Sequence, residues 1–269
     1  MALTHRIKQG SKVSLDDIDP AETGPYHGKD DPKVVRHLLE DVERLKVLQE
    51  RLYAEGKQAL LVVFQAMDAG GKDGTLRHVV GPLDSRSVHV VAFKAPSAEE
   101  LGHDFLWRVH AHTPRKGEIT VFNRSHYEDV LVGRVMKLVP KEMWSQRYEH
   151  INAFERLLAA EGTRIVKFFL HVSKDEQKRR LEERLADPDK RWKFDPGDLP
   201  VREKWADFRK AYEVALSKCS TPWAPWHVVP ADNKWYRNLA VARTLVRTLE
   251  DMAPKFPEPS FDYRSIVIR

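Results

Sequence analysis

Apolar runs and helical stretches alternate along most of the chain. From Lys33 onward, VVRHLLEDVERLKVLQERLY places apolar residues at helical spacing and AEG ends the pattern, which predicts an amphipathic helix. Five runs rich in valine, isoleucine and phenylalanine then alternate with helical stretches: LLVVFQ at 60, VHVVAF at 88, ITVFN at 119, RIVKFFLH at 164 and WHVVP at 226. Continuous apolar runs are typical of strands covered on both faces. The sequence therefore predicts an α/β fold in three layers, with a five-stranded parallel sheet between helices.

The predicted sheet also indicates where a ligand would bind. Ligands of open parallel sheets bind beyond the carboxyl ends of the strands. The loops that start at Gln65, Lys94, Asn123, His171 and Pro230 are therefore expected to converge on one site.

The pattern divides the chain into three parts. Residues 1–32 are polar and rich in turns (DIDPAETGPYHGKDDP), too poor in apolar pattern for a core element, so we expect an arm that lies on the domain or on a neighbouring molecule. Residues 33–255 form the predicted domain, with a lid at about 174–200, and residues 256–269 form a C-terminal tail.

Composition narrows the class of protein. Of the 269 residues, 42% are hydrophobic and 32% are charged, and no apolar run is long enough to cross a bilayer. The N-terminus has no apolar signal-peptide core, and the single cysteine, Cys219, cannot form an internal disulfide, so we expect a cytoplasmic protein. A net charge of +5 favours an anionic partner, but most of the 45 basic and 40 acidic residues must neutralise one another.

The stretch FQAMDAGGKDGT resembles a phosphate-binding loop with departures. Ala66 replaces the first glycine of the usual pattern, and Asp73 replaces the hydroxyl residue that binds magnesium. The glycines permit close backbone approach, the following helix directs free amides at an anion, and Lys72 adds a charge. The predicted phosphate-binding residues here are Ala69, Gly70, Gly71, Lys72, Asp73, Gly74 and Thr75. The alternative is a plain glycine turn with a solvated lysine.

Two carboxylates in this loop need a cation beside a polyphosphate, because like charges repel. Asp68 is therefore predicted to ligate a metal ion or to anchor its water. Asp73 has two interpretations, a metal-site residue or an acid in the first helical turn, where the helix dipole stabilises it.

The third strand ends in VFNRSHYEDVLVGRV. Asn123 and Arg124 stand where a second motif of a nucleotide-hydrolysing enzyme falls, and the guanidinium suits phosphate oxygens. Arg134 and Lys137 are predicted to continue a basic, phosphate-binding surface along the next helix. Glu128 either ligates a second metal ion or pairs with Arg124.

Basic residues also crowd SKDEQKRRLEERLADPDKRWKFDPGDL. The default for such a run is a solvated helix with salt bridges. However, Arg180 and Arg184 share one helical face, and a proline-containing stretch breaks the helix, as expected for a mobile lid over phosphates.

The loop after the second strand contains three candidate nucleotide-binding residues, Lys94, Asp104 and Arg108. A zinc site at His103, His110 and His112 is not supported, because the usual ligand spacings are absent.

Several blocks together resemble the family-2 polyphosphate kinases, in their single-domain form. They are FQAMDAGGKDGT, HDFLWRVH, FNRSHYEDVL, GTRIVKFFLHVSKDEQ, WKFDPGDL and APWHVVPADNKWYRNLAVA, in the same order over about residues 33–250. The resemblance implies a P-loop kinase fold similar to that of thymidylate kinase, Mg²⁺ (with Mn²⁺ as an alternative), and transfer of phosphate from inorganic polyphosphate to ADP or AMP, reversibly with ATP. It also implies a basic polyphosphate channel and a homo-oligomer, dimer or tetramer, that binds neither nucleic acid nor membrane.

By motif position, the resemblance gives catalytic roles to Asp68, Lys72, Asn123, Arg124 and Arg180, and makes Arg180, Arg184 and Lys193 lid contacts. Asn123, where one-substrate relatives often have aspartate, together with Glu128 resembles the subgroup that phosphorylates both mono- and diphosphates. One departure is GPLDSRSV, where Asn-Pro-Gln-Gly is common, so the shape of that loop is expected to differ from the family pattern.

Two other functions remain alternatives. An ATP-dependent nucleoside monophosphate kinase would need a strict ATP-binding loop, which Ala66 and Asp73 argue against. A basic nucleic-acid-binding protein would explain the high pI but neither the phosphate loop nor the Asn123–Arg124 pair.

Overall fold

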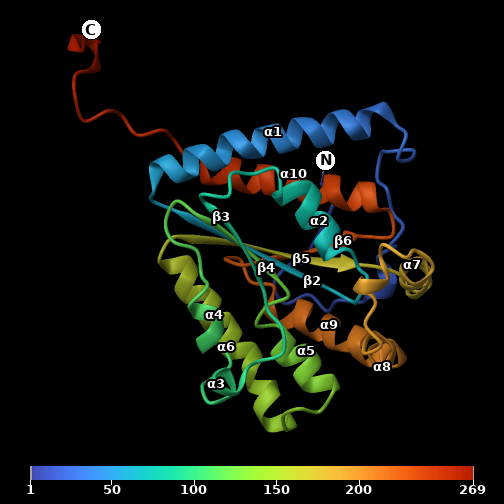
Figure 1. Ribbon diagram of the computed structural model, residues 1–269. Helices are drawn as coiled ribbons and strands as arrows, with labels where there is room; N and C mark the ends of the chain where they lie inside the picture. The colour runs from blue at the N-terminus through green and yellow to red at the C-terminus, as the bar shows by residue number, and fades with distance from the viewer. Residues whose placement is uncertain (1, 269) are drawn as a thin grey trace.

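A single mixed sheet organises the protein, whose computed structural model describes residues 2–268. The strand order is β1-β6-β5-β2-β4-β3 (Figure 1). The strands are β1 (His5–Arg6), β2 (Ala59–Ala66), β3 (Val88–Ala92), β4 (Ile119–Asn123), β5 (Thr163–His171) and β6 (Trp226–Pro230). Strands β2, β3, β4, β5 and β6 run parallel to one another. The α/β fold and all five predicted parallel strands are therefore confirmed.

The predicted number of strands was wrong by one. Strand β1 pairs antiparallel with β6, with His5 opposite Val228, so the sheet has six strands and is mixed. An edge strand of two residues is too short to carry a periodic pattern, which is why the sequence did not reveal it.

Helices cover both faces of the sheet (Figure 1). One face is covered by α1 (Pro32–Glu55), α10 (Lys234–Met252), the short α2 (Lys72–Thr75) and the π-helical turn Leu76–Val80. The other face is covered by α5 (Glu128–Val135), α6 (Lys141–Ala160) and α9 (Trp205–Cys219). The remaining helices are α3 (Ala98–Leu101), α4 (Trp107–His110), α7 (Lys174–Ala186) and α8 (Asp198–Glu203), and 3-10 turns lie at Leu15–Asp17, Arg191–Lys193 and Tyr263–Ser265. None of the helices within residues 2–268 is long and apolar enough to cross a membrane.

Strand β2 shows why its apolar run is continuous. Leu60, Val62 and Phe64 pack toward α1 and α10, whereas Leu61 and Val63 pack toward α5, α6 and α9. All eight residues of β2 are buried. Because neighbouring side chains point to opposite faces of a strand, each face needs its own apolar set, and the two cores together hold the strand that leads into the phosphate loop.

The N-terminal segment contributes to both cores, contrary to the expectation that it holds no core element. Leu3 is 6% exposed in the core beneath α10, and Leu15 is 2% exposed in the core beside α9. Their apolar neighbours are widely spaced along an irregular chain, so no helical or strand period marks them. At the other end, residues 256–268 leave the body after α10 (Figure 1), and Phe261 and Ile266 are exposed.

Candidate active site

The phosphate loop connects the end of β2 to the start of α2. Gly71 has φ 104°, in the region that favours glycine, and a Cβ atom on Gly70 would lie 2.7 Å from the Cβ of Ala66. Ala69 adopts φ 56° without being glycine. The loop is therefore tightly folded around its own strand end, as expected for a backbone that must approach a ligand closely.

Lys72 and Thr75 stabilise this loop from within. Lys72 Nζ donates a hydrogen bond to the carbonyl oxygen of Ala66 at 3.3 Å. Burial, together with the neighbouring positive charge of Arg124, lowers the pKa of Lys72. The hydroxyl of Thr75 is fully buried and donates to the carbonyl oxygen of Gly71 at 3.2 Å. Thr75 thus braces the loop, whereas Lys72 lines the cavity described below.

The segment after β4 meets the phosphate loop through two polar contacts. Arg124 Nη2 donates to Asp68 Oδ1 at 3.0 Å, and Asn123 Nδ2 donates to Asp73 Oδ1 at 2.8 Å. Arg124 has φ 62°, and its amide donates to the carbonyl oxygen of Phe64 at 3.1 Å. A non-glycine residue in this conformation is strained, so the surroundings must hold it.

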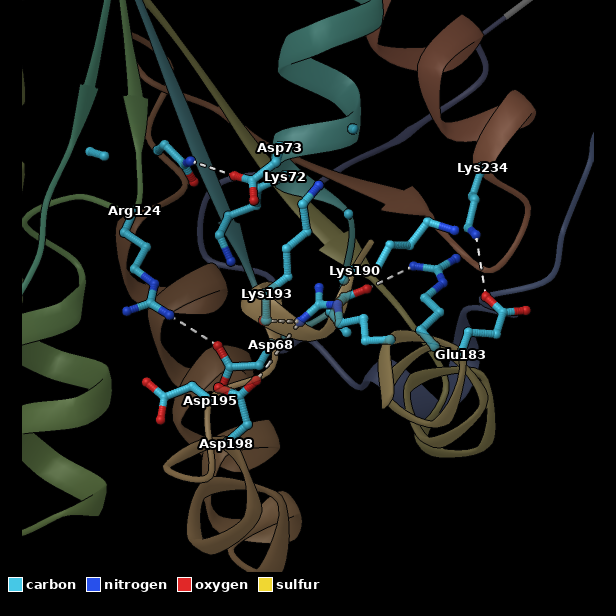
Figure 2. Close-up of a pocket in the computed structure, with 18 of the residues that line it drawn as sticks. Asp68, Lys72, Asp73, Arg124, Glu183, Lys190, Lys193, Asp195, Asp198 and Lys234 are labelled. Carbon is cyan, nitrogen blue, oxygen red and sulfur yellow. Dashed lines mark hydrogen bonds and ion pairs between the residues drawn. The ribbon is translucent and has the colours of Figure 1, made fainter. Parts of the chain in front are cut away.

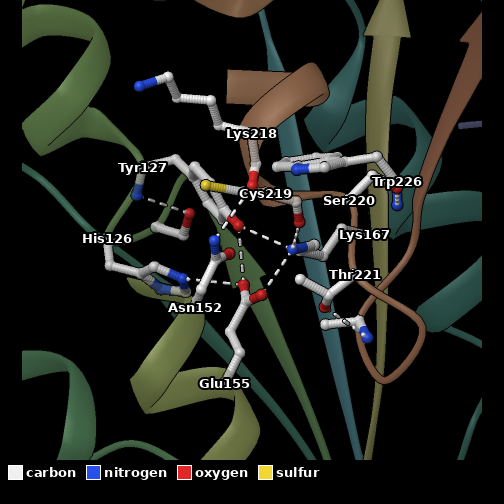
Figure 3. A network of polar contacts seen from close by, with 12 residues as sticks. His126, Tyr127, Asn152, Glu155, Lys167, Lys218, Cys219, Ser220, Thr221 and Trp226 are labelled. Carbon is white, nitrogen blue, oxygen red and sulfur yellow. Dashed lines mark hydrogen bonds and ion pairs between the residues drawn. The ribbon is translucent and has the colours of Figure 1, made fainter. Parts of the chain in front are cut away.

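A buried polar network holds the next residues (Figure 3). Lys167 Nζ, on β5, donates to Glu155 Oε2 at 2.6 Å, to the Tyr127 hydroxyl at 2.7 Å and to the Cys219 carbonyl oxygen at 2.7 Å. All three ammonium donors are therefore used. The Tyr127 hydroxyl donates to Glu155 Oε1 at 2.9 Å, and His126 Nε2 lies 3.3 Å from the same oxygen. The ion pair thus anchors the chain beyond Arg124.

Glu128 follows this anchor at the start of α5. Burial raises the pKa of Glu128, although the positive charges of Arg124 and Lys72 act against that rise. Glu128 therefore lies within the field of both cations.

Arg180 is a structural clamp as well as a lining residue of the cavity. Its side chain is 6% exposed, and its guanidinium donates to the carbonyl oxygens of Ala69 at 3.0 Å, Ala231 at 2.6 Å and Asp232 at 2.9 Å. Its Nε also donates to Glu176 at 2.7 Å. Arg180 therefore fixes the phosphate loop to the first turn of α7 and to the loop after β6.

One cavity of about 500 Å³ joins these elements (Figure 2). Its lining residues are Asp68, Ala69, Gly70, Gly71, Lys72, Asp73, Gly74, Ala92, Phe93, Lys94, Asn123, Arg124, Arg180, Glu183, Arg184, Lys190, Lys193, Asp195, Asp198 and Lys234. They come from the loops after β2, β3, β4, β5 and β6. The prediction that these five loops converge on one site is confirmed.

Three carboxylates meet at one side of this cavity, where residues 195–198 face the phosphate loop. Figure 2 shows Asp195 and Asp198 beside Asp68. Burial raises the pKa of Asp198 to about 6, with a further contribution from the charge of Asp68. Arg184, whose Nη1 lies 3.9 Å from Asp198 Oδ2, opposes that rise. This corner therefore carries concentrated negative charge within an otherwise basic cavity.

Six predicted site residues do not line this cavity: Thr75 and Glu128, described above, and four others. Asp104 Oδ1 accepts from the amide of Leu106 at 2.9 Å, and Arg108, which is 8% exposed, donates to the Lys94 carbonyl oxygen at 2.9 Å. Arg134 and Lys137 line a separate cavity of about 660 Å³ at the far end of α5, beside Trp144. Helix α5 begins near the site and runs away from it, so the predicted basic surface is not continuous with the phosphate loop.

The sequence interpretation left five polar lining residues without a site role. They are Glu183, Lys190, Asp195, Asp198 and Lys234. Two features of the sequence point to them. The stretch DPGD contains both Asp195 and Asp198, and Lys234 follows the end of β6, where a ligand-binding loop is expected. Lys234 Nζ lies 3.7 Å from Glu183 Oε2 (Figure 2).

Known proteins share both the sequence and this architecture. The family described as Polyphosphate kinase 2 (PPK2) matches residues 29–257. The chain belongs to the polyphosphate kinase 2 family. The resemblance seen in the motifs is thereby confirmed, and the matched range contains every residue that lines the cavity.

Relatives within the polyphosphate kinase 2 family align along nearly the whole chain. An AMP/ADP-polyphosphate phosphotransferase of Meiothermus ruber is 51% identical over 98% of this chain and 98% of its own length. An ADP-polyphosphate phosphotransferase of Rhodopseudomonas palustris is 44% identical over 94% and 91%. The crystal structure of Polyphosphate Kinase 2 from Arthrobacter aurescens TC1 is similar with a TM-score of 0.90, 43% identity, and coverage of 98% and 97%.

Proposed function

We propose that this protein transfers phosphoryl groups from inorganic polyphosphate to AMP and ADP, forming ADP and ATP, in a reversible reaction. The observation that carries the proposal is the cavity that joins the phosphate loop to the lid. Eight basic residues line it, namely Lys72, Lys94, Arg124, Arg180, Arg184, Lys190, Lys193 and Lys234, against five acidic ones, Asp68, Asp73, Glu183, Asp195 and Asp198. The M. ruber relative is named for polyphosphate with both AMP and ADP, and the R. palustris relative for polyphosphate with ADP.

The geometry suits in-line phosphoryl transfer, in which positioning and charge stabilisation supply most of the catalysis. Lys72 and Arg124 would bind the equatorial oxygens of the phosphoryl group in transfer, because both cations lie beside Asp68 at the centre of the site. Arg184 and Lys193 would bind the polyphosphate from the lid. Asn123 would keep Asp73 directed toward the loop through their hydrogen bond.

We further propose that Mg²⁺, or Mn²⁺, acts at this site. Asp68 would hold the metal ion with Asp198, because these two carboxylates share one corner of the cavity and the charge of Asp68 contributes to the raised pKa of Asp198. Within residues 2–268, no group of three or more acidic, histidine or cysteine residues is arranged to hold a metal ion by itself. A site with two carboxylates fits Mg²⁺, which usually takes one or two carboxylates together with water and substrate phosphates. When bound, the metal ion would neutralise charge between donor and acceptor phosphates.

The proposed function is tested by an assay in which polyphosphate is the phosphate donor and no ATP is added. Purified protein would be mixed with Mg²⁺, long-chain polyphosphate and either AMP or ADP, and the nucleotides separated by anion-exchange chromatography. ADP should give ATP, and AMP should give ADP followed by ATP. Lys72→Ala is the matched control, because it removes a transition-state contact and should lower kcat rather than merely raise KM. An absence of nucleotide products with both acceptors would contradict the proposal.

We also propose that the protein forms a homo-oligomer, as the family resemblance implied. The outer surface of α1 supports this, since Val35 and Leu39 are 55% and 61% exposed. Light scattering on the purified protein should give a dimer or tetramer mass, and a monomer mass would contradict it.

The buried, free Cys219 agrees with a reducing compartment such as the cytoplasm.

A further inference from the structure

A buried arginine lies against the back of the phosphate loop. Arg237, in the first turn of α10, is 2% exposed. A Cβ atom added to Gly71 would lie 1.8 Å from Arg237 Nη1, and one added to Gly74 would lie 3.0 Å from Nη2. Its guanidinium therefore occupies the space that side chains at these two positions would need. Glycine at both positions lets the positive charge approach the loop backbone closely.

No carboxylate in the described part of the chain balances this charge. The acceptor of Arg237 is Asn238 Oδ1, 3.2 Å from Nε and 2.9 Å from Nη2, and this amide oxygen is neutral. The neighbouring charge is that of Arg180, which is also positive; together with burial, it lowers the pKa of Arg237 to about 9. Arg243, two turns along the same helix, shows the usual arrangement, since its Nε lies 2.8 and 2.7 Å from the two carboxylate oxygens of Asp41.

An unbalanced buried charge is costly, because water no longer solvates it and no counter-charge replaces that solvation. The cost is recovered if an anion binds nearby in the same poorly screened environment. The loop in front of Arg237 is the one that lines the cavity with Gly71, Lys72 and Gly74. A phosphate chain bound there would face the guanidinium through the backbone of two glycines.

We propose that Arg237 is a positioning residue whose buried charge is balanced by the polyphosphate bound on the other side of the glycine loop. The inference rests on the proposed function and deepens it. Arg237 does not line the cavity and would not touch the substrate. It would attract the phosphate chain through the loop and hold the loop backbone in the shape that binds it.

The proposal predicts opposite effects on the free and the bound protein. Arg237→Met keeps an unbranched side chain, shorter than that of arginine, and removes the charge, so it should raise the Tm of the free protein by about 2–4 °C. The same variant should raise KM for long-chain polyphosphate about tenfold, which is the change expected for losing one poorly screened charge pair. KM for ADP should change less than about threefold, because ADP carries fewer phosphates. The rise in Tm that polyphosphate and Mg²⁺ cause should be smaller in Arg237→Met than in the wild type.

Two further variants separate charge from packing. Arg237→Lys keeps the charge and should retain most of the polyphosphate-induced rise in Tm. Arg243→Met removes a paired arginine from the same helix, so it should lower the Tm of the free protein and leave that rise unchanged.

The proposal would be overturned if Arg237→Met lowered the Tm of the free protein or failed to fold, or if it left KM for polyphosphate unchanged. Equal losses in Arg237→Met and Arg237→Lys would also overturn it, since charge would then not be the cause. If wild-type protein produced no nucleotide from polyphosphate, the proposed function itself would be wrong; an active wild type with an unaffected Arg237→Met would contradict this inference alone.

Discussion

Arg124 Nη2 lies 3.0 Å from Asp68 Oδ1, so the segment after β4 and the phosphate loop are joined by a charged hydrogen bond at the centre of the cavity. The two residues lie 56 positions apart in the chain. Their contact follows from the parallel pairing of β2 with β4, in which Phe64 lies opposite Asn123. A phosphate bound beside this pair would meet a cation and a carboxylate that are already positioned.

Asp68→Asn should leave the fold intact and abolish most activity. The amide keeps the size of the side chain and can still accept from Arg124, but it loses the charge proposed to hold Mg²⁺. We expect kcat to fall about 100-fold or more, as when one important electrostatic contact is removed, while circular dichroism and Tm stay close to those of the wild type. Turnover equal to that of the wild type would mean that Asp68 only shapes the turn.

Arg184 and Arg179 should separate the lid from the solvated surface. Arg184 lines the cavity, so Arg184→Gln should raise KM for polyphosphate and weaken its dependence on salt more than it affects KM for ADP. Arg179 is exposed and pairs with Glu176 and Glu183 on its own helix, so Arg179→Gln is the matched control and should be nearly neutral. Equal effects of the two substitutions would indicate a diffuse basic surface instead of a lid contact.

The raised pKa of Asp198 predicts how the stability of the protein depends on pH. Its pKa in the folded protein is raised to about 6 from an ordinary value of 3.8. The folded state therefore binds the proton more tightly, and the resulting stability is present below about pH 4 and lost as the pH rises to 6. Asp198→Asn lacks this loss, so its Tm advantage over the wild type should grow between pH 4.5 and 6 and then level off.

Asp187 provides a control, because its pKa is shifted in the direction opposite to that of Asp198. It lies in the same lid segment, and a hydrogen bond from Lys190 lowers the pKa of its carboxyl. Its stabilising contribution is therefore present above about pH 4 and lost in more acidic solution, so Asp187→Asn should never be more stable than the wild type near neutral pH. A Tm difference for Asp198→Asn that stays flat across this range would contradict the assignment of Asp198.

Lys167→Met should strongly destabilise the protein. The substitution leaves the carboxylate of Glu155 buried without its cation, which typically costs about 3–5 kcal/mol. Replacing both partners, as Lys167→Met with Glu155→Leu, should recover part of that loss. Urea unfolding measures both effects, with the exposed Lys210→Met as a control expected to change the free energy of unfolding by less than about 0.5 kcal/mol. A loss below about 1 kcal/mol in Lys167→Met would contradict a fully buried ion pair.

The sequence predicted the parts of the fold that have a period or a motif. Five strands, the helix that begins near Pro32 and the convergence of five loops follow from apolar runs and from the rule for strand ends. Strand β1 and the buried Leu15 were missed because a two-residue strand and an isolated leucine have no period to detect.

The direction of the helices in the fold explains why some predicted site residues lie outside the cavity. The guanidinium of Arg134 is chemically suited to phosphate, but Arg134 lies at the far end of α5, beside a different cavity. Arg180 lines the cavity as predicted for a polyphosphate contact, but it also donates to three backbone carbonyl oxygens, a role that no helical periodicity could reveal. Arg237 has an ordinary place in a helical pattern, and only the packing against Gly71 shows its position.

The source of the transferred phosphate can be followed directly with a radioactive label. Wild-type protein would be incubated with ADP, Mg²⁺ and polyphosphate labelled with ³²P, without ATP, and the label followed into the nucleotides. We predict that label appears in the γ-phosphate of ATP in step with the loss of ADP, and that Lys72→Ala abolishes most of this transfer. ATP formed without label, or no ATP at all from a folded protein, would contradict the claim that polyphosphate is the donor.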